Sequence, residues 1–198
     1  MIEAAPALGI LAAVVGVVDT VPYVRDIMRG ATRPHRGTWL IWGVLAIVVL
    51  LSQRADGASW SLVMAGAQAV LTCLVFVLAI RMGEGGLAAS DAILIAIAGG
   101  GVAGWLLVEE PVVATACVIV ADIIGAAMMV PNVYRDPGSE TLVTFALASA
   151  GGALAAGAVG MVDVSLLAYP VYYCLINGAI ALLIHYRRAV PSGAYLGA

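Results

Sequence analysis

The stretch VGVVDTVPYVR at 15–25 recurs in altered form as IGAAMMVPNVYR at 124–135. In each copy a glycine precedes a proline by the same spacing, Gly16 to Pro22 and Gly125 to Pro131. Each proline is followed by an aromatic residue and an arginine, which is how an apolar helix ends at a membrane surface. Equal spacing of this kind predicts an internal repeat.

The composition around these two stretches is that of a membrane protein. Of the 198 residues, 63% are hydrophobic and 11% are charged, with a mean hydropathy of +1.07. Soluble domains carry about 25% charged residues. All nine basic residues are arginine, which excludes a lysine Schiff base. The net charge of −3 gives no reason to expect nucleic acid as a partner.

Seven apolar stretches are long enough to predict an all-α integral membrane protein with seven transmembrane helices. The second of them is short and is expected to begin before Thr38. Short loops rich in Gly, Pro, Asp and Arg separate the stretches. They are Ala7–Tyr23, Thr38–Leu51, Ser59–Met82, Leu87–Val108, Val112–Tyr134, Leu142–Met161 and Val164–Tyr186.

The arginines predict the orientation in the membrane. On one side lie Arg25, Arg29, Arg33, Arg36, Arg81, Arg135, Arg187 and Arg188, and on the other only Arg54. That second side carries the acidic residues Glu3, Asp56, Glu109, Glu110 and Asp163. Because cytoplasmic loops are enriched in basic residues, we expect a multi-pass plasma-membrane protein with its N-terminus outside and its C-terminus in the cytoplasm.

The repeat predicts a 3+1+3 arrangement of the helices. The first three-helix unit covers residues 1–84, a linker helix covers 85–110, a second unit covers 111–190, and a tail covers 191–198. The second helices of the two units share a pattern of threonine, aromatic and small residue at 38–43 and 141–146. A single linker helix makes the two units parallel, a known plan for transporters whose site lies between repeats near the midplane.

These features resemble the SWEET and PQ-loop transporter superfamily. In that group a proline, often in Pro-Gln or Pro-Asn, ends the first helix of each unit, and here the pairs are Pro22-Tyr23 and Pro131-Asn132. The basic loop leading into TRPHRGTWLIW at 32–42 is also similar. The resemblance implies a carrier of a small, sugar-like polar solute that works by alternating access. Within it, Asn177 looks like the asparagine that contacts sugar in the third helix of such units.

A second family shares the layout and leaves the substrate open. Vitamin transporters of the nicotinamide-riboside type also have three plus one plus three helices and carry a W-x-x-W motif, which Trp39–Trp42 matches. A vitamin, a nucleoside or an amino acid is therefore an alternative substrate, with or without proton coupling.

The candidate substrate-binding residues are amides, hydroxyls and aromatics in the predicted helices. Tyr169, Tyr173 and Asn177 are spaced by four and share one helix face. Amides suit an uncharged or zwitterionic solute because they both donate and accept hydrogen bonds; alternatively, they hold neighbouring helices together. The complete set is Trp42, Gln68, Thr72, Asn132, Phe145, Tyr173 and Asn177.

Two acids lie well inside predicted helices. Asp122 is a candidate for proton coupling or for accepting a hydrogen bond from substrate, because a carboxylate within the bilayer is costly and usually faces a cavity or a partner. Asp19 has the same possible role, but it is alternatively neutralised by Arg25 or by a loop arginine. Pro22 and Pro131 interrupt helix hydrogen bonds and are candidate hinges.

No cofactor or metal site is predicted. Cys73, Cys117 and Cys174 stand singly in apolar runs, where cysteine acts as a small hydrophobe. An intramembrane enzyme or an assembly subunit is a remote alternative, since no nucleophile with its base and no metal motif is evident. The expected partners are a small-molecule substrate, the lipid bilayer and, in one arrangement, a second copy of the chain.

Overall fold

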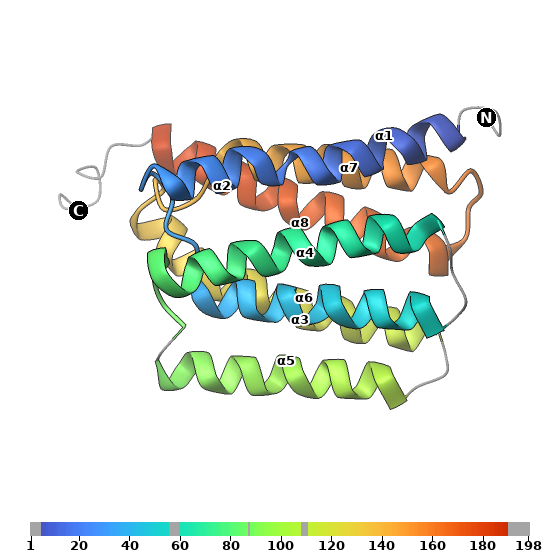
Figure 1. The fold of residues 1–198 in the computed structure, drawn as a ribbon, viewed down its shortest axis with the longest axis horizontal. Helices are drawn as coiled ribbons and strands as arrows, with labels where there is room; N and C mark the ends of the chain where they lie inside the picture. The colour runs from blue at the N-terminus through green and yellow to red at the C-terminus, as the bar shows by residue number, and fades with distance from the viewer. Residues whose placement is uncertain (1–4, 56–59, 87, 108–110, 190–198) are drawn as a thin grey trace, which may run out of the picture.

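The computed structural model describes residues 5–55, 60–86, 88–107 and 111–189, and these form a bundle of helices, as expected. Successive helices run in alternating directions along one axis, with α1 and α2 following one another in the same direction (Figure 1). The helices are α1 (Ala5–Val18), α2 (Thr20–Met28), α3 (Arg36–Ala55), α4 (Trp60–Met82), α5 (Ala89–Leu107), α6 (Pro111–Arg135), α7 (Leu142–Ala158) and α8 (Val164–Ala189). The predicted tail at 191–198 and Glu3, Asp56, Glu109 and Glu110 lie outside the described residues.

Three helical stretches in the described part of the chain are long and apolar enough to cross a membrane. They are Ala5–Met28, Thr115–Arg135 and Leu166–Ala189, and four further apolar helices are shorter. Large apolar side chains are exposed along the helices, among them Ile10 (68%), Val70 (67%) and Leu182 (70%). An apolar exterior of this extent fits hydrocarbon rather than water, so length, composition and surface all support membrane association.

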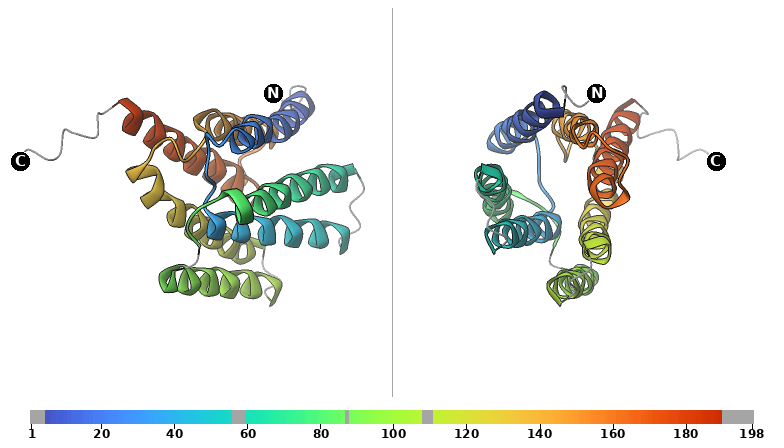
Figure 2. Two further views of the ribbon diagram at one scale, coloured as in Figure 1. Left: turned by 60° about the vertical axis from the view of Figure 1, so that its left-hand side comes forward. Right: turned by 90° about the vertical axis from the view of Figure 1, so that its right-hand side faces the viewer.

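The helices pack in a reciprocal pattern. α1 packs against α7, and α3 packs against α6. α4 contacts both α1 and α3, while α8 contacts both α6 and α7. Seen end-on, the helices surround a common centre, with α5 on the outside against α3 and α6 (Figure 2).

The two repeated prolines have different local effects. Pro22 lies in the first turn of α2, and because it has no N–H the carbonyl of Val18 loses its helical partner. The helix is interrupted at Asp19, whose backbone stays helical at φ −60° and ψ −29°. Pro131 lies inside α6, which continues to Arg135 without a break.

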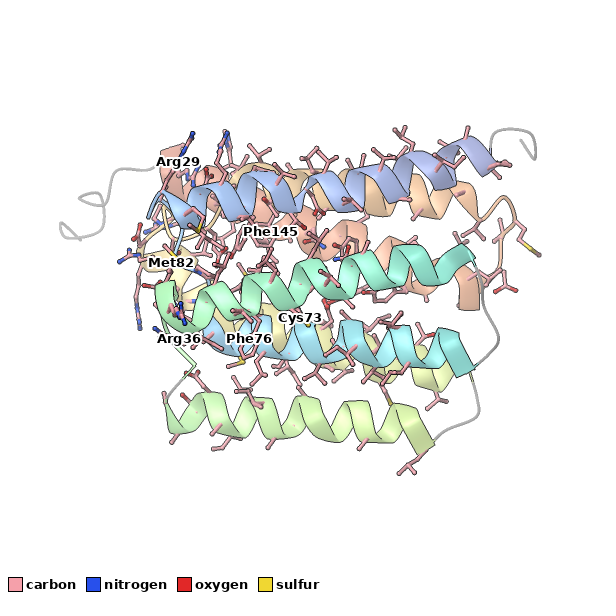
Figure 3. The ribbon with its side chains drawn as sticks, in the orientation of Figure 1. Arg29, Arg36, Cys73, Phe76, Met82 and Phe145 are labelled. Atoms are coloured by element: carbon pink, nitrogen blue, oxygen red, sulfur yellow. The ribbon has the colours of Figure 1, made fainter. Side chains whose placement is uncertain are left out.

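A packed core closes one end of the bundle. We call this end, where α2, α4, α6 and α8 finish and α3 and α7 begin, the arginine-rich end, since Arg29 and Arg36 lie there (Figure 3). Its core side chains come from helices of both predicted units. The fully buried ones include Tyr23, Ile27, Val75, Met129, Val133 and Ile184, with Phe145 and Trp39 beside them. A core of this kind leaves no space for solvent.

The close approach of α7 to α8 depends on Gly152. A Cβ atom at this position would lie 2.6 Å from the backbone nitrogen of Cys174 and 2.8 Å from its Cα. Because backbone cannot move aside cheaply, we expect Gly152→Ala to lower the free energy of unfolding by about 1–3 kcal/mol.

Gly99 in α5 is the matched control, because a Cβ added there meets nothing within 4 Å. Gly99→Ala is expected to be neutral or to stabilise the protein by up to about 1 kcal/mol through helix propensity. Thermal unfolding of the two variants in detergent measures the difference. Equal melting temperatures would mean that the α7–α8 contact is not as tight as the structure has it.

Candidate functional site

A cavity of about 690 Å³ lies among the helices. This is within the range of pockets that hold small organic molecules. Its walls come from α1, α2, α3, α4, α6, α7 and α8. The polar and aromatic residues that line it are Asp19, Thr20, Trp39, Trp42, Gln68, Thr72, Thr115, Asp122, Thr144, Phe145, Tyr169, Tyr173 and Asn177.

The cavity occupies the part of the bundle away from the arginine-rich end. In α1 and α2 the lining residues run from Ala12 to Thr20, and in α7 from Thr144 to Ala155. The core around Tyr23 and Met129 lies between the cavity and the arginine-rich surface. Three residues of this core, Trp39, Phe145 and Ile180, also line the cavity, so the core forms its wall toward the arginine-rich end.

Most of the residues predicted to bind substrate meet at this cavity. Gln68 and Thr72 come from α4, Tyr173 and Asn177 from α8, and Trp42 and Phe145 from α3 and α7. Asn132 does not line it, because it lies beyond Pro131 in the last turns of α6. The two candidate hinges, Pro22 and Pro131, also lie outside the lining.

Asp19 is buried at the junction of α1 and α2, with 5% of its surface exposed. Its carboxylate accepts a hydrogen bond from Thr20 Oγ1 at 3.0 Å. Its backbone carbonyl accepts another from Thr144 Oγ1 of α7 at 2.9 Å. Arg25 forms an ion pair with Asp26 at 3.0 Å instead, so the alternative in which Arg25 neutralises Asp19 is wrong.

Asp122 lies on α6 and is 8% exposed. Tyr172 of α8 donates a hydrogen bond to its Oδ2 at 2.5 Å. Asp19 and Asp122 do not align with each other in the repeat predicted from the sequence, yet both line the same cavity.

The two cavity amides use their nitrogens within their own helices. Asn177 Nδ2 donates to the backbone oxygen of Tyr173 at 2.9 Å, and Gln68 Nε2 donates to Thr72 Oγ1 at 3.3 Å. Each amide therefore keeps its oxygen as an acceptor and one N–H as a donor for a bound molecule.

Trp42 forms part of the cavity wall against α6. Its Nε1 is buried and has no hydrogen-bond partner among the residues that the structure describes. A Cβ at Gly125 would lie 3.0 Å from that nitrogen, so the glycine is what lets the indole lie against the helix backbone. An unpartnered buried donor is unusual in folded proteins.

A chain of three buried side chains lies beneath the cavity at the arginine-rich end. Trp39 Nε1 donates to Tyr23 Oη at 2.9 Å, and Tyr23 in turn donates to Glu140 Oε2 at 2.5 Å. Glu140 is 1% exposed and lies in the short connection between α6 and α7. The chain therefore joins α2 and α3 to the loop that follows α6.

The connection between α2 and α3 and the connection between α6 and α7 make further bonds at this end. Thr32 Oγ1 and Thr141 Oγ1 lie 2.7 Å apart, and Thr141 Oγ1 also donates to Asp26 Oδ2 at 3.1 Å. The backbone N–H of Arg33 donates to the Ser139 carbonyl at 2.9 Å. The guanidinium of Arg33 pairs with Asp136.

The titration of two groups at this end is perturbed. Burial raises the pKa of Glu140 to about 8; the hydrogen bond from Tyr23 and the backbone N–H of His35 oppose the rise, and the charge of nearby Glu84 adds to it. Burial lowers the pKa of His35. A neutral imidazole suits its position, since its Nδ1 lies 3.3 Å from the backbone nitrogen of Thr38 and accepts that N–H in the first turn of α3.

Comparisons with known proteins add no further constraint on this site. No family model, curated protein or solved structure matches this chain. The described residues hold no group of three or more His, Cys, Asp or Glu placed to bind a metal ion. The function is therefore argued from the cavity itself.

Several residues of the site were not among the predicted ones. Glu140 reads as a turn residue in Asp-Pro-Gly-Ser-Glu, and nothing in its local pattern signals burial. The sequence places Tyr23 and Trp39 in motifs, but it does not predict that the two side chains contact each other. Thr144 gave one usable signal, since a threonine inside an apolar helix needs a hydrogen-bond acceptor.

Proposed function

We propose that the chain is a seven-helix membrane transporter that moves a small polar solute by alternating access. In this proposal α1 and α2 together count as one membrane-spanning helix. The helices α1–α4 and α6–α8 then form two parallel three-helix units, and α5 links them. The observation that carries it is the single cavity that Asp19, Gln68, Asp122 and Asn177 reach from different helices. A cavity lined by polar groups inside an apolar bundle is where a transporter binds its solute.

The reciprocal packing supports two equivalent units. The first helix of each proposed unit packs against the second helix of the other, as α1 does with α7 and α6 with α3. Each contact includes a threonine that bonds to a backbone carbonyl: Thr144 to Asp19 at 2.9 Å and Thr38 to Gly125 at 2.6 Å. In each unit the third helix contacts the other two. Two rigid units with this interface can rock against each other around a fixed site.

The arginine distribution supports the orientation proposed from the sequence. If the arginine-rich end faces the cytoplasm, the core around Tyr23 lies between the cavity and the cytoplasm, as in a state of the transport cycle that is closed on that side. The plasma membrane is the proposed location.

Uptake into proteoliposomes tests the proposal. Purified protein is reconstituted and supplied with labelled sugars, amino acids and vitamins in turn, with empty liposomes as the baseline. Saturable uptake of one polar solute is expected. Failure of every solute to enter, with protein that is monodisperse and thermally stable, would overturn the transport proposal.

Asn177→Ala is expected to weaken substrate binding by about 1–3 kcal/mol, the usual loss when a buried polar partner is removed. The Michaelis constant for uptake would then rise about 5- to 150-fold.

Asn132→Ala is the matched control, because it removes the same amide from α6 outside the cavity lining. It should leave the constant within about twofold of the original. Equal effects of the two substitutions would assign Asn177 to helix packing.

A further inference from the structure

The charge of the cavity is one-sided. Its lining includes two acidic residues, Asp19 and Asp122, and no arginine or histidine among the described residues. At the arginine-rich end, the arginines whose bonds are described pair with groups outside the cavity. Arg33 pairs with Asp136, and Arg188 donates to the backbone oxygens of Pro137 and Glu140. The protein therefore builds an anionic lining without a counter-ion of its own in the cavity.

Both carboxylates are more than nine-tenths buried and only partly satisfied. The Asp19 carboxylate accepts from the hydroxyl and the backbone N–H of Thr20, and the Asp122 carboxylate accepts from Tyr172. A carboxylate has about four acceptor positions, so each keeps acceptor positions for a bound group. A buried negative charge without a cationic partner is costly. A proton or a bound cation must offset it.

The other groups of the lining are uncharged amides, hydroxyls and aromatic rings. Asn177 and Gln68 each use one N–H within their own helix, which leaves the oxygen and one N–H of each amide. Tyr169 and Tyr173 stack with ring centroids 6.0 Å apart, and both line the cavity with Trp42. Aromatic faces attract cations, by about 2 kcal/mol or more when water is excluded.

Together these groups favour one chemical class of solute. An anion needs a positive charge, which the lining does not supply. A neutral polyol can bond to the hydroxyls and amides but leaves the two carboxylates without a counter-charge. An ammonium or guanidinium group satisfies free carboxylate oxygens directly. The apolar body of such a solute would lie against the aromatic wall.

We infer that the cavity binds an organic cation, an amine-bearing solute whose positive nitrogen lies between Asp19 and Asp122 and whose body stacks on Tyr169, Tyr173 and Trp42. This inference rests on the proposed function and narrows its substrate class. It does not require the substrate to be known, because charge and shape can be separated with model compounds.

The test compares two probes of the same shape. Phenethylamine and 2-phenylethanol share a ring and a two-carbon arm, and they differ in ending in an ammonium or a hydroxyl group. Binding to the purified protein in detergent is measured by calorimetry, with glucose as a neutral polyol. Phenethylamine is expected to bind about tenfold or more tightly than either neutral probe.

Two substitutions locate the binding. Asp19→Asn and Asp122→Asn are each expected to weaken phenethylamine binding about tenfold or more and to leave 2-phenylethanol unchanged. Asp163→Asn is the control, because Asp163 lies in the turn before α8, outside the cavity, where its Oδ1 accepts the Leu166 N–H. It should bind phenethylamine as the unaltered protein does.

The outcomes separate the two proposals. Equal or tighter binding of a neutral probe, or unchanged amine affinity in both aspartate variants, would overturn the cation assignment while leaving transport of another solute open. The assignment also falls if none of the three probes binds. Only if the liposome panel of sugars, amino acids and vitamins fails as well does the transporter proposal fall with it.

Discussion

The double variant Thr32→Cys/Thr141→Cys is expected to lose nearly all uptake when oxidised and to regain it on reduction. Thr32 lies between α2 and α3, and Thr141 lies just before α7, so the pair joins the two proposed units. Their hydroxyl oxygens are 2.7 Å apart. The two side chains therefore touch, and cysteines at these positions need their Cβ atoms to come within about 3.5–4.5 Å for a disulfide to form.

The physical reason for the loss is that alternating access requires these loops to separate. The arginine-rich end must open for solute to leave on that side. In the structure the Thr32–Thr141 contact is one of several that hold it shut, together with the bond between Tyr23 and Glu140. Noncovalent contacts of this kind can break and re-form during transport. A covalent bond between the same positions cannot.

The measurement uses a background in which Cys73, Cys117 and Cys174 are replaced by alanine. Uptake into proteoliposomes is compared after treatment with a copper–phenanthroline oxidant and again after dithiothreitol. Each single variant should be insensitive to oxidation. Binding of solute to the cavity should survive in the oxidised double variant, because the cavity residues are untouched.

A second cross-link within one unit provides the control. Ser149 Oγ of α7 lies 3.7 Å from Cys174 Sγ of α8, so Ser149→Cys, with Cys174 retained, places a bond inside the second unit. Rigid-body rocking leaves this contact intact, and uptake should persist after oxidation. If the Thr32/Thr141 cross-link forms in full and uptake continues, the arginine-rich end is not the gate.

The helices themselves were largely predictable from the sequence. Apolar runs bounded by Gly, Pro, Asp and Arg predict helices whose ends fall within a few residues of the observed ones. The expected early start of the second helix is confirmed, since α3 begins at Arg36. The sequence predicts one continuous helix at Ala7–Tyr23 and so misses the break at Asp19 between α1 and α2, although it marks Pro22 as a residue that interrupts helix hydrogen bonds.

Most of the polar residues that line the cavity could be predicted from the sequence, but which helices bring them together could not. Spacing by four placed Tyr169, Tyr173 and Asn177 on one face, and all three line the cavity. Sequence spacing within one helix says nothing of which other helix faces it. Asp19 and Asp122 could therefore not be placed at one cavity until α1 and α6 were placed against α7 and α3.

Glu140 shows why loop residues escape such reasoning. Only Asp19 and Asp122 were expected to need a functional explanation, because they are the acids inside predicted helices. Glu140 lies outside the helices and is nonetheless 1% exposed. Its burial results from a long-range contact with Tyr23, 117 positions away in the chain, and long-range packing has no local sequence signature.

Glu140→Gln is expected to make the protein more stable than the unaltered chain at alkaline pH. It should also remove part of the pH dependence of the free energy of unfolding. Burial raises the pKa of Glu140 to about 8, from an ordinary value of 4.5. Below pH 4.5 the side chain is protonated in both the folded and the unfolded chain. Between pH 4.5 and 8 the unfolded chain releases this proton while the folded protein retains it.

The free energy of unfolding therefore falls as pH rises through this window. The slope from this one group is at most about 1.4 kcal/mol per pH unit. Above pH 8 the group is ionised in both states and the slope ends. Glutamine has no proton to release, so the variant lacks this contribution and keeps an amide oxygen to accept the Tyr23 hydroxyl.

Unfolding in detergent at a series of pH values from 4 to about 9 measures the effect. The stability of Glu140→Gln minus that of the unaltered protein should rise steadily with pH between 4.5 and 8 and then level off, because every other titrating group cancels in the difference. Asp163→Asn, which changes an acid outside the buried network, should show no such trend.

Glu140→Ala separates the charge from the hydrogen bond. The substitution removes the acceptor of the Tyr23 hydroxyl and leaves a space in the core of the arginine-rich end. The Glu140→Ala protein should therefore be less stable than Glu140→Gln at every pH. If the difference between the glutamine variant and the unaltered protein is flat with pH, Glu140 is ionised in the folded state and the closed end holds a buried charge. In that case Tyr23 and the His35 backbone N–H, which act to lower the pKa of Glu140, outweigh the cost of burial.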